Sequence, residues 1–133
     1  MKKIISAILC IMVVFSLSAC GGKVSNAKTQ EVESSIYSQE DINQAIEVIK
    51  NDFKSEWKGC TLQEIYYAGD DYNKGYEDWA DRNNADDVIV LLSTFKTGSF
   101  AEEGLSKNST YSKYNWILVR SDDGQWKRVD NGY

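Results

Sequence analysis

The chain has 133 residues, enough for one small domain beyond an N-terminal export signal and too few for two. Its formal net charge is −5, which argues against a nucleic-acid-binding protein, since such a protein needs a basic face to displace counterions from phosphates. The chain contains no histidine, so mechanisms that use an imidazole as base or metal ligand are excluded.

The first twenty residues have the features of an export signal. A basic start is followed by an apolar run over residues 4–18, which is shorter than the roughly 20 residues that a membrane-spanning helix needs. The run closes with Leu17-Ser18-Ala19-Cys20. Small residues before a cysteine suit a signal peptidase, and this order of residues resembles the lipobox of bacterial lipoproteins.

The lipobox implies a lipid-anchored mature protein. The signal peptide would cover residues 1–19, cleavage would separate Ala19 from Cys20, and a diacylglyceryl group would modify the Cys20 sulfur. Two or three acyl chains hold a protein firmly to a bilayer, whereas one chain binds reversibly. We therefore expect a protein on the extracytoplasmic face of the cell membrane. The other interpretation is an ordinary secretory signal with a chance cysteine.

The segment after the lipobox predicts a flexible tether. Residues 20–36 are polar, begin with two glycines after Cys20, and show no hydrophobic period. We place the folded domain over residues 37–133. Its one cysteine, Cys60, has no partner for an intramolecular disulfide within that domain, so the core alone must hold the fold.

Residues 39–58 predict an amphipathic helix at the start of the domain. Ser38 is a suitable N-cap, and Asp41 three residues later completes a variant of the capping box. Gly59 suits a left-handed C-terminal cap. Apolar residues recur every three or four positions, at Ile42, Ala45, Ile46, Ile49, Phe53 and Trp57.

Four strands and a second, short helix are predicted after it. β-branched and aromatic residues indicate the strands, and Asp123-Gly124 is a strong hairpin signal. The expected ranges are strands at 60–68, 88–95, 111–120 and 125–129, and a short helix over about 72–83. The order α-β-α-β-β-β indicates an α+β domain, in which the N-terminal helix packs on a four-stranded antiparallel sheet. The place of the first strand beside the other three stays open.

Several segments of the domain carry a family resemblance. They are Tyr37-Ser38-Gln39-Glu40-Asp41-Ile42, Gly59-Cys60-Thr61-Leu62, Trp116-Ile117-Leu118-Val119-Arg120 and Gly124-Gln125-Trp126-Lys127. They resemble a family of small uncharacterised lipoproteins of Firmicutes, especially gut anaerobes, over about residues 37–133. The resemblance implies a cystatin-like or nuclear-transport-factor-like α+β domain. It implies no established activity and no catalytic residues.

Cys60 is the first candidate functional residue. A nucleophilic cysteine needs a base or a cationic neighbour to form the thiolate, and Lys58 is the only cation close to it in sequence. A hydrophobic residue after a capping glycine often packs back on the helix. We therefore interpret Cys60 as a buried structural residue.

The acidic stretch from Asp70 to Asp87 is the second candidate. It begins like a calcium-binding loop at Asp71, but Tyr76 stands where such a loop requires glycine and Arg82 where it requires a bidentate glutamate. A solvated acidic face is the simpler interpretation. The alternative is a weak cation site or a docking surface for a basic partner.

Aromatic residues are the third candidate, as a binding surface. Tyrosine and tryptophan are favoured at binding surfaces because they combine a large apolar body with a polar group. The alternative is that most of them pack in the core or cover sheet edges. The residues of the predicted binding surface are Tyr66, Tyr72, Tyr76, Trp79, Tyr111 and Tyr114.

The sequence favours binding over catalysis. No paired acid and base, nucleophile elbow, phosphate loop or metal-ligand cluster is visible, so we expect no enzyme, no metal and no cofactor. The first hypothesis is a membrane-anchored module that binds an envelope protein, a peptide or a glycan through the sheet or the loop over residues 97–110. The alternative is a small-molecule-binding or weakly catalytic domain with a pocket between the helix and the sheet.

Overall fold

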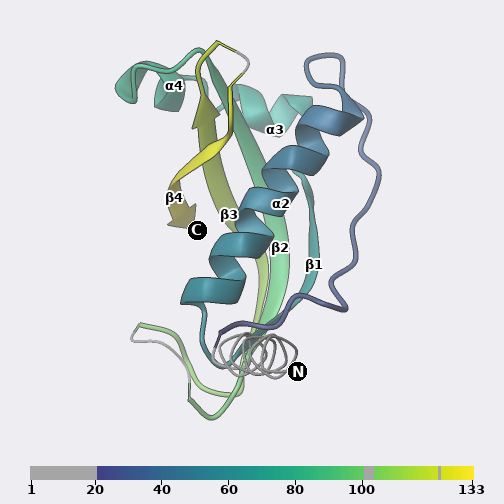
Figure 1. Ribbon diagram of the computed structural model, residues 1–133, viewed down its shortest axis with the longest axis vertical. Helices are drawn as coiled ribbons and strands as arrows, with labels where there is room; N and C mark the ends of the chain where they lie inside the picture. Colours follow the sequence, from purple (N-terminus) through teal and green to yellow (C-terminus); the bar gives the residue numbers. More distant parts are fainter. Residues whose placement is uncertain (1–20, 101–103, 123) are drawn as a thin grey trace, which may run out of the picture.

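The computed structural model describes residues 21–100, 104–122 and 124–133. One long helix, α2 (Gln39–Glu56), packs on a four-stranded antiparallel sheet (Figure 1). This arrangement confirms the predicted α+β fold class. The predicted signal peptide, its cleavage position at Ala19, and the lipidation residue Cys20 lie outside the described residues.

The sheet is a continuous meander. Its strands are β1 (Cys60–Tyr67), β2 (Asp87–Thr97), β3 (Thr110–Arg120) and β4 (Lys127–Gly132), and they lie in the order β1-β2-β3-β4 with every neighbouring pair antiparallel. β1 therefore lies at the edge of the sheet, next to β2. The sequence left this position of the first strand open. Each strand pairs with the next one along the chain, although the connection from β1 to β2 carries two short helices.

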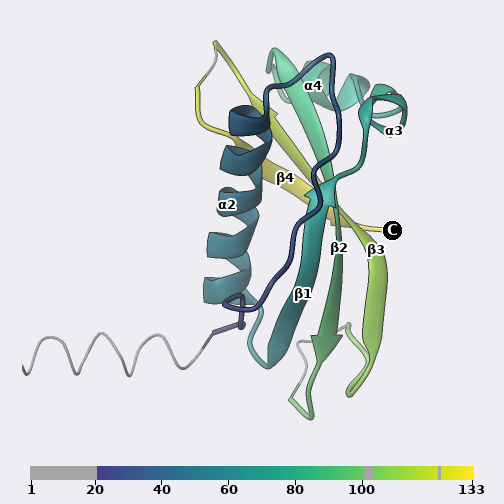
Figure 2. The ribbon, with the colours of Figure 1, turned by 90° about the vertical axis from the view of Figure 1, so that its right-hand side faces the viewer.

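The predicted short helix is in fact two five-residue helices, α3 (Asp70–Lys74) and α4 (Asp78–Arg82). Gly75 follows α3 directly, and its amide donates to the Tyr72 carbonyl oxygen at 3.2 Å, a tighter turn than an α-helix has. Figure 2 shows both helices on the side of the sheet that α2 leaves open.

The sequence predicts the start of α2 correctly, whereas the helix ends at Glu56, two residues before the predicted end, with Trp57 as its C-cap. The Ser38 hydroxyl accepts a hydrogen bond from the Asp41 amide at 3.1 Å, and the Ser38 amide donates to the Asp41 carboxylate at 3.3 Å, which completes the capping box. Gly59 has a φ of 76° and turns the chain into β1. The helix face against the sheet consists of Ile42, Ala45, Ile46, Ile49 and Phe53.

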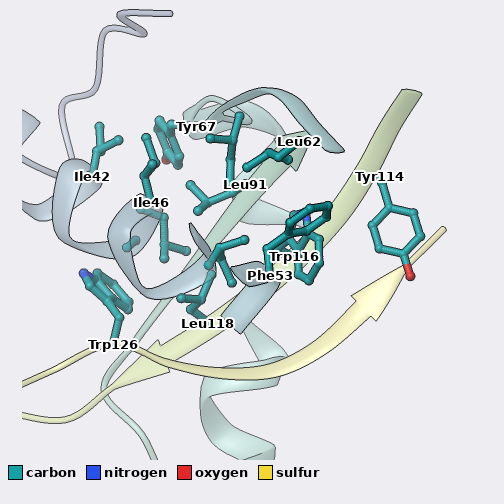
Figure 3. Close-up of a cluster of buried hydrophobic side chains, with 14 of the residues drawn as sticks. Ile42, Ile46, Phe53, Leu62, Tyr67, Leu91, Tyr114, Trp116, Leu118 and Trp126 are labelled. Atoms are coloured by element: carbon teal, nitrogen blue, oxygen red, sulfur yellow. The ribbon is translucent and has the colours of Figure 1, made fainter. Parts of the chain in front are cut away.

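Hydrophobic side chains fill both faces of the sheet. On the α2 side, Phe53 lies beside Trp116, with Tyr114 at the edge of the group (Figure 3). The indole N–H of Trp116 donates to the hydroxyl of Ser93 at 2.7 Å, so this polar group is satisfied inside the core. On the other side, a smaller cluster consists of Ala80, Val88, Val90, Ile117 and Val119.

The segment predicted to be a flexible tether instead lies along β1 between Lys23 and Lys28 and then crosses to the start of α2 (Figure 2). The backbones of Lys23 and Lys28 form parallel bridges with Thr61 and Glu64, and backbone hydrogen bonds run in both directions along the pair. The side chains of Val24, Ala27 and Val32 pack against the α2-side core. The tether prediction is therefore wrong for residues 21–36.

The physical reason for this difference is the edge of the sheet. Without the segment, β1 would expose a row of unpaired N–H and C=O groups along its outer edge. Backbone pairing of this kind requires no particular side chains, so a polar sequence without a hydrophobic period can form it. The search for periodicity that correctly predicted the strands could not detect it.

Asp70 binds the C-terminal end of the segment over residues 21–36. Its carboxylate accepts hydrogen bonds from the Ser34 hydroxyl at 2.7 Å, the Ser35 amide at 2.8 Å and the Tyr67 hydroxyl at 2.7 Å. The bond from Ser34 is the largest of the effects that lower the pKa of Asp70 to about 2. The residue thus ties the segment to the start of α3.

Arg120 joins the N-terminal end of α2 to the sheet. Its side chain is buried and pairs with the carboxylates of Asp41 and Asp87, both at 2.9 Å. The guanidinium also lies over the ring of Trp126, 4.4 Å from the centroid. The hydrogen bond from Arg120 holds the pKa of Asp41 below its usual value.

Candidate functional site

The fold separates the predicted aromatic residues onto two faces of the sheet. Tyr66 pairs with Leu92, whose neighbour on the next strand is Asn115, and this row of side chains faces away from α2. Tyr72 on α3 reaches the same row, because its hydroxyl donates to the Asn115 side-chain oxygen at 2.7 Å. We use the name aromatic surface for Tyr66, Tyr72, Tyr76 and Trp79.

Tyr114 does not belong to that surface. It is only 7% exposed and lies on the α2 face, where its ring packs against Phe95, Trp116 and Trp57 at centroid distances of 5.1–5.7 Å. Its hydroxyl accepts a hydrogen bond from the Asn131 amide at 2.9 Å. Tyr114 therefore lies in the α2-side core, on the opposite face of the sheet from the aromatic surface to which the sequence assigned it.

Tyr111 is half-buried on the same α2 face and supports the loop between β2 and β3. Its ring stacks on Phe95 at a centroid distance of 5.1 Å, and its hydroxyl accepts a hydrogen bond from the Ser106 amide at 2.8 Å. The ring and the hydroxyl of Tyr111 thus both stabilise the fold. Tyr111 is not part of the aromatic surface either, which corrects the prediction for a second residue.

Hydrogen bonds hold Tyr72 and Tyr76 of the aromatic surface in place. The rings of Tyr72 and Tyr76 stack at 5.4 Å with an interplanar angle of 24°, and the Tyr76 hydroxyl donates to the Tyr72 hydroxyl at 3.3 Å. The Asn115 side chain accepts from Tyr72 and donates to the Gly132 carbonyl at 3.1 Å. The bond to Tyr72, together with partial burial, raises the pKa of Tyr76 to about 12. The Tyr76 phenol is therefore neutral at physiological pH.

Trp79 lies at the outer edge of this surface and is half-buried. The guanidinium of Arg82 stands 4.0 Å from the centre of its ring, and the same guanidinium pairs with Asp78 at 3.0 Å. The cation covers one face of the indole and restricts the rotation of the ring. The position of Trp79 is thus set by α4 itself.

A small hollow lies between these aromatic residues and β4. Its volume is about 120 Å³, well below the roughly 300–1,000 Å³ of a pocket for a drug-sized ligand. A hollow of this size accommodates one ring or one side chain of a longer ligand that lies across the surface. The residues around it are Tyr76, Trp79, Asn115, Ile117, Asp130, Asn131, Gly132 and Tyr133.

Larger hollows lie along the flanks of α2. One of about 700 Å³ runs between the outward polar side of α2 and residues 124–126, and one of about 680 Å³ lies between residues 32–39 and Asp70. A third, of about 400 Å³, lies where α2 ends above the sheet, with Trp57, Tyr114 and Arg128 in its wall. Elsewhere the described side chains of the core fill the space between α2 and the sheet.

Two carboxylates of the acidic stretch, Asp70 and Asp87, are partly buried and serve the fold, whereas its other acidic residues are exposed. Asp70 fastens the N-terminal segment, Asp87 pairs with Arg120, and Asp78 pairs with Arg82. Within residues 21–100, 104–122 and 124–133, no group of three or more acidic or cysteine side chains gathers as metal ligands would.

Cys60 lies beneath the turn that joins α2 to β1. It is 1% exposed, and its sulfur stands 3.8 Å from the Lys58 carbonyl oxygen. The thiol belongs to the α2-side core, as the sequence indicates, and reagents in solution do not reach it in the folded state.

Two further findings bear on the function. In the part of the chain that the structure describes, no helix combines the length and the hydrophobicity that a membrane span requires. Comparisons of the chain with protein-family models, with curated proteins and with solved structures gave no match.

Proposed function

We propose that the protein is a lipid-anchored binding module on the extracytoplasmic face of the cell membrane, and that it binds a glycan of the cell envelope without catalysis. The sequence leaves protein, peptide and glycan ligands open. The observation that carries the choice is the hollow in which Tyr76 and Trp79 stand beside the polar side chains of Asn115 and Asp130.

The chemistry of this hollow suits a sugar. A sugar ring presents an apolar face of C–H groups that packs on an aromatic ring, and a rim of hydroxyl groups that require hydrogen-bond partners. Amide and carboxylate groups supply both donors and acceptors for such a rim. Because Asn115 is already held by Tyr72 and Gly132, little further ordering of that side chain is needed on binding.

The same hollow supports binding rather than cleavage. A glycoside hydrolase usually needs two carboxyl groups on opposite sides of the scissile bond, about 5–10 Å apart. Among the described residues around the hollow, Asp130 is the only acidic one. Membrane attachment rests on the lipobox that ends at Cys20.

The test of the ligand is binding of purified residues 21–133 to cell-wall polysaccharide, by sedimentation and on a glycan array. We expect Trp79→Ala to weaken binding about thirtyfold, which corresponds to a loss of about 2 kcal/mol for a central aromatic contact. Phe100→Ala is the matched control, because Phe100 is an exposed aromatic residue outside this surface. Equal binding by the Trp79 variant, or capture of a stoichiometric envelope protein and no glycan, would contradict the proposal.

The anchor has a separate test. Cys20→Ser should release the protein from the membrane fraction or leave the precursor unprocessed, because the lipid and its attachment atom are both lost. Unchanged detergent extraction of this variant would count against lipidation.

A second candidate is a small-molecule site in the hollow of about 400 Å³ at the end of α2, which lies in the size range of ligand pockets. Trp57 and Tyr114 give it aromatic walls, and Arg128 pairs there with Glu56 at 2.7 Å. A thermal-shift screen of metabolites tests this candidate, with Arg128→Gln expected to abolish any shift.

A further inference from the structure

Exposed lysines gather at the end of the fold where α2 stops. Lys54 lies in the last turn of α2, and Lys58 follows in the turn to β1. The backbones of Lys23 and Lys96 flank Thr61 near the start of β1. Among the described residues none of these lysines forms an ion pair. With Lys107 of the loop between β2 and β3, they form what we call the basic end: Lys23, Lys54, Lys58, Lys96 and Lys107.

The chain enters the fold at this same end (Figure 2). The Gly22 amide donates to the Lys54 carbonyl oxygen at 3.1 Å. A Cβ atom on Gly21 would lie 1.5 Å from that oxygen, and one on Gly22 would lie 2.5 Å from the Phe53 oxygen, so only glycine fits in either place. The first residues after Cys20 are therefore packed against α2, and a lipid on Cys20 would bring the basic end to the bilayer.

An exposed aromatic residue lies beside these lysines. Phe100 is 85% exposed, and its backbone passes so close to Gly59 that a Cβ there would lie 2.4 Å from the Phe100 oxygen. Aromatic and basic side chains together are typical of surfaces at the membrane interface.

The acidic residues lie mainly at the opposite end. α2 has 18 residues, so its two ends are about 27 Å apart, or about three Debye lengths at physiological ionic strength. Repulsion between an anionic surface and the far end is therefore largely screened. The exposed acidic residues of that end include Glu40, Asp71, Glu77, Asp78, Asp81 and Asp86.

We propose that the basic end lies directly on anionic phospholipid headgroups, with Phe100 at the interface, so that the domain stands upright on the membrane. The inference rests on the proposed anchor at Cys20 for its setting in the cell. It adds a contact between protein and lipid that does not require the acyl chains. It also directs α3, α4 and the aromatic surface away from the bilayer.

The test is sedimentation of residues 21–133 with phosphatidylglycerol-containing vesicles and with neutral phosphatidylcholine vesicles. This fragment contains every residue of the described core. We expect weak binding to the anionic vesicles only, which 0.5 M salt abolishes. Lys54→Gln with Lys58→Gln should reduce the partition coefficient about 25-fold, since each lysine near an anionic surface contributes about fivefold.

Lys74→Gln is the matched control, because Lys74 is an exposed lysine on α3 at the other end. It should leave the partition coefficient unchanged, and Phe100→Ala should reduce it. Absence of binding at low salt, or an equal loss in the Lys74 control, would overturn the proposal. The Cys20→Ser fractionation reports separately on the anchor, so failure of the lipid contact and failure of the anchor give different results.

Discussion

At the residue scale, Asp70 connects protonation to stability. Its carboxylate accepts hydrogen bonds from the N-terminal segment and from β1, and the bond from Ser34 contributes most to lowering its pKa to about 2. Because the pKa in the folded state lies below that of an unfolded aspartate, the ionised group stabilises the fold fully above about pH 4. This contribution is lost as the pH falls through 2.

Asp70→Asn should therefore lower the free energy of unfolding at pH 7 by about 1–2 kcal/mol, the range for hydrogen bonds to a charged group at a partly exposed site. The difference in Tm between the variant and the wild type should shrink as the pH falls from 4 to 2. Thermal melts over this range measure it. Asp71→Asn is the control, because Asp71 is the exposed neighbour of Asp70 in the same helix. A pH-independent difference for Asp70→Asn would contradict this account.

Tyr114 and Asn115 show which features of the candidate site can be predicted from the sequence and which cannot. The alternation of Tyr114 with Trp116 and Leu118 already places Tyr114 on the core face, and this signal was sufficient to exclude it from a binding surface. The contribution of Asn115 could not be predicted. Its side chain meets Tyr72 only because the sheet order brings a residue of β3 beside α3.

At the element scale, the segment over residues 21–36 is the main departure from the sequence-based prediction. Its backbone pairing with β1 and its apolar contacts with the core both contribute to stability. Replacing residues 23–32 by a glycine-serine sequence of equal length should lower the free energy of unfolding by roughly 2–4 kcal/mol, since Val24, Ala27 and Val32 each lose part of their burial. Urea denaturation measures this change.

The matched control for that replacement is Ser25→Gly with Asn26→Ser, because both residues are exposed and the change keeps Val24, Ala27 and Val32. If residues 23–32 were instead a flexible tether, their replacement would leave the midpoint of urea denaturation unchanged. Limited proteolysis offers a second readout, because cleavage within residues 23–32 should be slow in the wild type and fast in the variant.

The elements with strong local signals were predicted well for an identifiable reason. α2 has a cap at each end and one continuous apolar face, and β2 and β3 have long runs of β-branched and aromatic residues. The second helix was predicted less well, because Gly75 interrupts a pattern that is otherwise helical. Local signals therefore predict elements, whereas sheet edges and sites depend on contacts between distant residues.

At the scale of the whole molecule, charge and aromatic residues are arranged along one axis. Lysines lie at the end where the chain enters, and acidic residues lie with α3 and α4 at the other end. A molecule with this arrangement has a large dipole although its net charge is negative. On an anionic bilayer, the setting proposed above, this dipole would favour the orientation that directs the aromatic surface away from the lipid.

The close packing of Gly21 and Gly22 has a consequence for proteolysis of the protein if it is anchored at Cys20, as proposed. Proteases that release surface proteins cut extended backbone, and a lipoprotein with a long tether offers such a stretch between bilayer and fold. Here the residues that follow Cys20 are hydrogen-bonded to α2 and β1 from the outset. A protein lipidated at Cys20 would therefore resist shedding, and its release would require that part of the domain first unfold.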